Sequence, residues 1–296
     1  MSCGAAFLGF TSASRAQELE PRALTNVPIG TNFLLLGYGY SEGNTLLDPA
    51  IPVEGLQSRL HSAVAAYVRA IDFFGMSSKV DLIVPGAIGD WNGALDGQDT
   101  SRHITGMGDP RVRLSFNFVG APAVRSNGFT DYNQSTIVGV SLQVVVPLGQ
   151  YDPNRLINLG SNRWSVRSQL GVSHSTGPWI IEAYGSVWLF ATNQNFLGGL
   201  SAKQRPLLAS KLHVIRTLSR GLWIGAGVGY AIGGRTEIEG VPRDTRISTF
   251  RFAVTGAIPI ALNHTVRITF ASGARVERGA DFDAIVLSYQ YRWGGS

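Results

Sequence analysis

The sequence predicts an all-β protein: a single transmembrane antiparallel β-barrel of about twelve strands, with ten or fourteen strands as alternatives. Three observations support this prediction. Apolar and polar residues alternate from about residue 30 to the C-terminus, as in strands with one apolar face. No apolar run approaches the ~18 residues that a membrane-spanning helix needs, although 44% of the residues are hydrophobic and only 15% are charged. Long and short connections follow one another, as in barrels with longer extracellular loops and short periplasmic turns.

The N-terminus has the pattern of a cleavable signal peptide, residues 1–16. A short apolar core ends at Phe10, and the small residues before and at Ala16 resemble a cleavage site. No Lys or Arg precedes this core, so either the signal is atypical or the true start lies further upstream. After cleavage we expect a periplasmic N-terminal segment, residues 17–29, too short for a large plug. The transmembrane β-barrel then takes up residues 30–296.

Twelve alternating segments make up the predicted barrel, each of about ten residues, the length that a tilted membrane strand requires. The last segment is the clearest, because Ile285, Leu287 and Tyr289 share one face while Ser288 and Gln290 share the other. The segments start near residues 30, 60, 79, 111, 135, 163, 179, 207, 222, 245, 264 and 282.

The connections between these segments alternate in length. Even-numbered connections are mostly tight, as at Gly177-Pro178, although the one at about residues 120–134 is longer than this rule expects. The odd-numbered connections are mostly long, at about residues 42–59, 91–108, 149–162, 192–205 and 236–244. An even number of strands returns both termini to the periplasm.

A soluble β-sandwich or propeller is the rival interpretation of the alternating pattern. Such folds have no reason to sort their loops by length, and the chain lacks the internal repeat of a propeller. Aromatic residues also favour the barrel, because they lie at or near strand ends, where membrane barrels place their interfacial girdles. These residues are Trp164, Trp179, Tyr289, Tyr291 and Trp293.

Several motifs resemble those of one outer-membrane family, the family named for the meta-pathway of phenol degradation. The motifs are Gly106-Met107-Gly108-Asp109, Asn158-Leu159-Gly160-Ser161-Asn162-Arg163-Trp164, Gly233-Gly234-Arg235-Thr236, Gly279-Ala280-Asp281-Phe282-Asp283 and Gln290-Tyr291-Arg292-Trp293. The resemblance implies uptake of aromatic or other hydrophobic compounds and a distant similarity to long-chain fatty-acid transporters. Those transporters carry a sizeable N-terminal hatch, for which this chain has no counterpart of that size.

The inward faces of the predicted strands carry the candidate lumen-lining and substrate residues. A charge facing lipid would cost about 2–4 kcal/mol near mid-membrane, so the charged residues are assigned to the lumen. The candidates are Arg69, Asp81, Arg113, Arg167, Gln169, Glu182, Lys211, Arg251, Arg267 and Arg292. Seven cations against two acids predict a cation-lined path, and Arg251 and Arg267 on neighbouring strands are the first choice for substrate contact.

Strand nine places three glycines on its inward face, Gly225, Gly227 and Gly229. Two interpretations are open: extra space in the lumen, or a site of close backbone approach. We favour the first.

The sequence favours a channel or transporter for small solutes in the bacterial outer membrane over a structural or adhesive barrel. A barrel enzyme acting on lipid is the weakest alternative, because His174 and Ser175 are adjacent and point to opposite faces of a strand. We expect no catalytic residue, cofactor or metal: Cys3 is the only cysteine, and the five histidines lack metal-ligand spacing.

The expected partners follow from an outer-membrane location. They are outer-membrane lipid and lipopolysaccharide, the barrel-assembly machinery during biogenesis, and a small-molecule solute. Nucleic acid is not expected, because the net charge of +5 forms no basic stripe.

Overall fold

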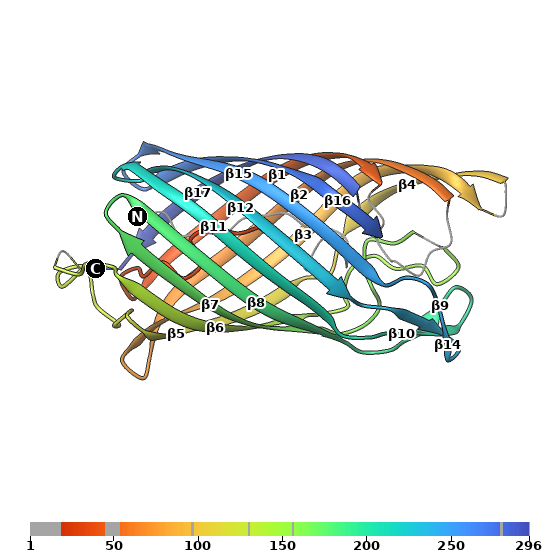
Figure 1. The fold of residues 1–296 in the computed structure, drawn as a ribbon, viewed down its shortest axis with the longest axis horizontal. Helices are drawn as coiled ribbons and strands as arrows, with labels where there is room; N and C mark the ends of the chain where they lie inside the picture. The colour runs from red at the N-terminus through yellow and green to blue at the C-terminus, as the bar shows by residue number, and fades with distance from the viewer. Residues whose placement is uncertain are drawn as a thin grey trace.

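The computed structural model describes residues 19–44, 54–95, 98–129, 131–155, 157–278 and 281–295. Twelve antiparallel strands form a closed barrel, as the sequence predicts (Figure 1). They are β1 (Thr31–Asn44), β2 (Glu54–Phe73), β3 (Met76–Leu95), β5 (Arg111–Val119), β6 (Thr136–Val145), β7 (Ser165–Thr176), β8 (Trp179–Phe190), β11 (Leu207–Ser219), β12 (Leu222–Gly233), β15 (Ile247–Ala261), β16 (His264–Arg278) and β17 (Asp281–Gly294). The barrel closes where β1 pairs with β17, Thr31 lying opposite Gly294.

β1 begins and β17 ends at the end of the barrel that carries the tight turns, which is therefore the periplasmic end (Figure 1). Gly177 between β7 and β8 and Gly221 between β11 and β12 have φ angles of 55° and 83°. Glycine adopts this left-handed conformation without a Cβ penalty, so it allows a strand to reverse within two residues.

The extracellular end contains more strand than the sequence predicts. β2 and β3 each have 20 residues, more than the ~9–11 that span a bilayer, and β4 (Gln98–Met107) pairs with the outer half of β3. Two of the expected loops instead form a small four-stranded sheet. Its strands are β9 (Asn193–Phe196), β10 (Leu200–Gln204), β13 (Thr236–Ile238) and β14 (Val241–Pro242).

The long periplasmic connection between β5 and β6 folds back onto the barrel end. The backbone nitrogen of Ser77 donates a hydrogen bond to the Ala121 carbonyl, and that of Ile29 donates to the Val124 carbonyl, at 2.9 and 3.0 Å. This long connection therefore links the β2–β3 turn to the N-terminal segment.

The two faces of the barrel wall differ in character. Outward residues such as Ile268 and Leu212 are 50% and 45% exposed and form an apolar surface suited to lipid. Trp164, Trp179 and Trp293 are also exposed, as expected for interfacial girdles. None of the described residues forms a helix long and apolar enough to cross a membrane.

Candidate functional site: the lumen and its N-terminal segment

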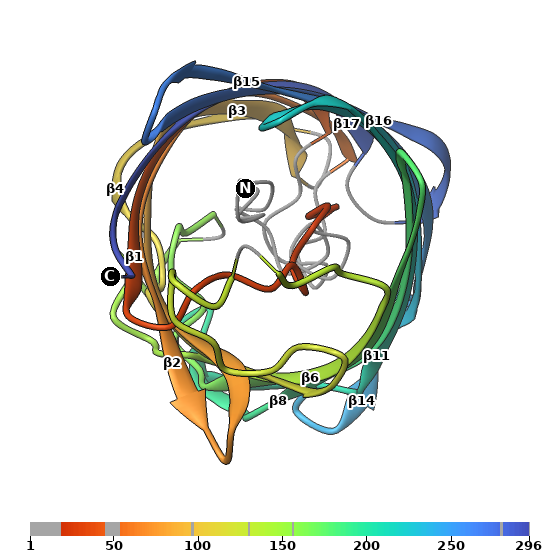
Figure 2. The same cartoon turned by 90° about the vertical axis from the view of Figure 1, so that its left-hand side faces the viewer.

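The N-terminal segment from Leu19 to Ile29 lies inside the barrel, across the lumen (Figure 2). Its apolar side chains pack on the inner wall. Leu19 clusters with Ala253 and Ala271, and Leu24 clusters with Ile137 and Tyr184. For residues 19–29 this position differs from the periplasmic one expected, because even a short segment fills a barrel of this size. Residues 17 and 18 and the expected signal peptide, residues 1–16, lie outside the described residues.

An ion-pair cluster joins this segment to the wall. Glu20 accepts two hydrogen bonds from the Arg113 guanidinium, at 2.7 and 3.2 Å, and Arg113 Nε donates to Asp81. All three side chains are buried. Burial by itself raises the pKa of the Glu20 carboxyl, but Arg113, Lys211 and Arg167 together lower it below its ordinary value. Glu20 therefore stays charged and bound to the wall.

Polar side chains of the wall also hold the backbone of the segment. Lys79 Nζ donates to the Ala23 carbonyl at 2.7 Å, and Asn117 Nδ2 donates to the Leu24 carbonyl at 3.1 Å. The backbone nitrogen of Arg22 donates to Glu182 at 2.7 Å. Arg22 has a φ of 67°, in the left-handed region, so the backbone turns sharply where it meets Glu182.

Nine of the ten predicted lumen residues face inward; Arg69 does not. It lies opposite Asn32 near the periplasmic end of β2 and is exposed, whereas its neighbours Val68 and Ala70 are buried in the lumen. Assigning Arg69 to the lumen was wrong because the argument from lipid cost fails near the interface, where a long cation reaches water. The inward residues are Asp81, Arg113, Arg167, Gln169, Glu182, Lys211, Arg251, Arg267 and Arg292.

Arg251 and Arg267 do not form one substrate contact. Arg251 lies opposite Gly273, whereas Arg267 lies opposite Ala257. They are therefore separated by six positions along β15, or roughly 20 Å at ~3.3 Å per residue. The Arg251 guanidinium lies 4.1 Å from the centre of the Phe282 ring, and Arg267 donates to Gln290 at 2.5 Å.

The other inward cations are spread along the lumen. Arg167 lies over Trp188 and Lys211 over Tyr184, at 5.3 and 5.2 Å from the ring centres. Arg292 lies at the periplasmic rim, beside a cavity of about 530 Å³. Several cations thus contact aromatic faces, which attract them by the ring quadrupole.

The inward glycines of β12 leave no groove. A Cβ added at Gly227 would lie 2.4 Å from the His213 ring, and one at Gly229 would lie 3.1 Å from Leu19. One at Gly225 would lie 3.0 Å from Ile215. Neighbouring side chains occupy the space, so the interpretation of close approach is correct and that of extra lumen space is wrong.

Apolar side chains line part of the upper lumen, a feature that was not predicted from the sequence. Trp188, Leu207, Ala231 and Ile247 form a buried cluster on the inner wall near the extracellular ends of their strands. A second cluster at the mouth contains Trp91, Leu56, Leu60, Ala87, Ile104, Ile157 and Leu159. The inner wall above the N-terminal segment therefore carries two apolar clusters, with Arg163 and Arg167 buried beside one of them.

Three further polar residues belong to the site and were not predicted from the sequence: Lys79, Arg111 and Glu20. Lys79 and Arg111 share the inward parity of Asp81 and Arg113, so alternation alone was a sufficient signal for them. Nothing local marks Glu20, which precedes the first strand.

Asp109 fastens the mouth loop, residues 149–162, to the start of β5. Its carboxylate accepts from the Gly149 nitrogen at 3.0 Å and from the nitrogen and Oγ of Ser161 at 2.8 and 2.6 Å. Any Cβ at Gly160 would lie 2.7 Å from the Gly149 backbone. The two motifs around Asp109 and Ser161 therefore meet in space.

His174 and Ser175 bond to different partners. His174 Nδ1 lies 2.8 Å from Thr136 Oγ1, and Ser175 Oγ accepts from Gln134 at 3.3 Å. Among the residues described, no group of three or more His, Cys, Asp or Glu is placed to hold a metal ion.

Many solved structures resemble the chain, among them the following two. An outer membrane channel from Pseudomonas putida F1 is 18% identical, with a TM-score of 0.77, over 93% of this chain and 100% of that one. The β domain of the Bordetella autotransporter BrkA is 10% identical, with a TM-score of 0.50, over 90% of this chain and 100% of that one. No functionally curated protein matches the sequence.

The closed barrel, its apolar outer face and the short turns at the end where β1 begins and β17 ends define an outer-membrane β-barrel. The model of one family, described as putative MetA-pathway of phenol degradation, matches residues 39–289. The chain belongs to this family.

Proposed function

We propose that the protein is a transporter for small hydrophobic, in particular aromatic, solutes across the bacterial outer membrane. The two apolar clusters on the inner wall above the N-terminal segment support this proposal, because the interior of a water-filled porin is polar throughout. The family description, which names phenol degradation, and the resemblance to an outer membrane channel agree with it.

The N-terminal segment lies across the periplasmic half of the solute path. A solute that leaves the upper lumen therefore meets this segment, which is held in place by Arg113, Lys79 and Glu182. We infer that passage requires the segment to shift. We also propose that lipopolysaccharide of the outer leaflet contacts the barrel wall, and that the barrel-assembly machinery inserts the chain during biogenesis.

The test is uptake of N-phenyl-1-naphthylamine, a neutral aromatic probe that an intact lipopolysaccharide layer slows. Cells expressing the protein should take it up several-fold faster than cells without it. Trp188→Gln should slow uptake, because it places an amide in the apolar wall. Trp164→Gln changes an exposed tryptophan and is the matched control, which should leave uptake unchanged. Equal uptake with and without the protein would refute the proposal.

A further inference from the structure

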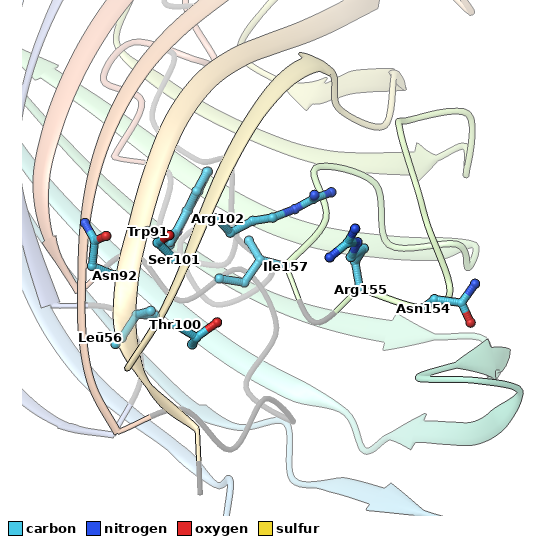
Figure 3. Close-up of a pocket in the computed structure, with 10 residues that line it drawn as sticks. Leu56, Trp91, Asn92, Thr100, Ser101, Arg102, Asn154, Arg155 and Ile157 are labelled. Carbon is cyan, nitrogen blue, oxygen red and sulfur yellow. The ribbon is translucent and has the colours of Figure 1, made fainter. Parts of the chain in front are cut away.

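A cavity of about 150 Å³ lies at the extracellular mouth, between β2, β3, β4 and the mouth loop (Figure 3). Its size suits one six-membered ring, since apolar cavities near 150 Å³ bind benzene.

One side of this mouth cavity is apolar. Leu56, Trp91 and Ile157 line it and are 4%, 1% and 7% exposed. They belong to a larger buried cluster, which fixes their positions. A flat ring would therefore meet an aromatic face and two aliphatic side chains without rearrangement of the wall.

The other side of the mouth cavity is basic. Arg102 lies directly opposite Trp91 in the β3–β4 ladder, so both side chains project from the same face. Arg102 Nε is buried and has no hydrogen-bond partner among the described residues. Arg155 approaches from the mouth loop, and its guanidinium extends toward the same space as that of Arg102 (Figure 3).

The charges around the mouth cavity favour an anion. None of the described residues that line it is acidic. Asp152 lies 3.8 Å from Arg155, but both side chains are about half exposed, so water screens this pair. A buried guanidinium N–H without a partner gains most from a charged acceptor.

We propose that the mouth cavity binds a small aromatic carboxylate, such as benzoate, as the first step of uptake. The ring lies against Trp91, Leu56 and Ile157, and the carboxylate accepts hydrogen bonds from Arg102, with Arg155 as the second cation. This inference rests on the proposed function and adds to it an anionic substrate class with its entrance site.

The first test is equilibrium binding of labelled benzoate to the purified full chain in detergent, with benzyl alcohol as the neutral probe. Arg102→Gln should weaken benzoate binding by about tenfold or more, equivalent to about 1.4 kcal/mol, and leave benzyl alcohol binding nearly unchanged. Trp91→Leu should weaken both. Arg59→Gln is the matched control, because Arg59 lies on β2 at the same end but is exposed on the outer face.

Arg155→Gln changes only an exposed loop side chain and should weaken benzoate binding even if changes in the strands impair folding. The proposal would be overturned if the wild type showed no saturable benzoate binding. It would also be overturned if Arg102→Gln and Arg155→Gln bound benzoate as tightly as the wild type. Uptake of N-phenyl-1-naphthylamine separates the two proposals. If it is unchanged in Arg102→Gln while benzoate binding fails, the transporter stands and only the carboxylate site falls.

Discussion

Arg113 presents its guanidinium to two carboxylates at once, Glu20 from the N-terminal segment and Asp81 from β3. The planar fork of arginine suits this arrangement, because its Nε and terminal nitrogens point in different directions. One side chain therefore couples the position of the segment to the wall.

Glu20→Gln should loosen the N-terminal segment and raise the ion conductance of the barrel. Removing one partner of a buried ion pair destabilises the structure by about 3–5 kcal/mol. Because Asp81 still neutralises Arg113, we expect a destabilisation at the lower end of that range. Single-channel recording in a planar bilayer measures the effect. Glu42→Gln, which removes an exposed partner of Arg59, should leave conductance unchanged. Equal conductance in wild type and Glu20→Gln would show that Glu20 does not hold the segment.

At the scale of elements, the mouth loop is shaped by one buried carboxylate. Asp109 is fully buried, and its two oxygens bind backbone groups at both ends of residues 149–162. Loops on a rigid barrel usually vary, whereas this one is held at both ends, on either side of the residues that line the mouth cavity.

Asp109→Asn should release the mouth loop without unfolding the barrel. The amide keeps one acceptor oxygen, so either the bond to Gly149 or those to Ser161 are lost, each worth about 1.5–3 kcal/mol to a charged group. Hydrogen exchange of residues 149–162 should quicken at least tenfold. Asp90→Asn, an exposed carboxylate on β3, is the control. Unchanged exchange in the loop would exclude Asp109 as its anchor.

Across the described part of the molecule, the buried charged side chains are mostly basic even when those of the N-terminal segment are included. Glu20 joins Asp81 and Glu182, while Lys79 and Arg111 add to the inward cations predicted from the sequence. A field inside low-dielectric walls is focused, so small anions should concentrate in the path.

We therefore expect anion preference in the reversal potential across a tenfold salt gradient, fading near 1 M salt as screening shortens to ~3 Å. Arg251→Gln and Arg267→Gln should each reduce the anion preference. Because the two residues lie roughly 20 Å apart, their effects should add in the double variant. Arg69→Gln, outside the lumen, is the matched control. Cation preference in the wild type would contradict the charge count.

Alternation along the chain is enough to predict the barrel, its twelve strands and the face on which most wall residues lie. These properties are encoded locally: each strand meets lipid on one face and the lumen on the other, so alternation reports both. Asp81, Glu182 and Lys211 follow from that period alone. Arg69 does not, because near the membrane boundary a cation is tolerated on either face.

What fills the barrel and its mouth depends on contacts between segments that are far apart in the sequence. Glu20 meets Arg113 across 93 positions of sequence, and β10 pairs with β13 from a different loop. Trp91 and Arg102 share one cavity through the register of a hairpin that the sequence presented as a loop. Each of these contacts depends on the closed barrel bringing distant segments together, and no local pattern of residues records which distant partner a side chain will meet.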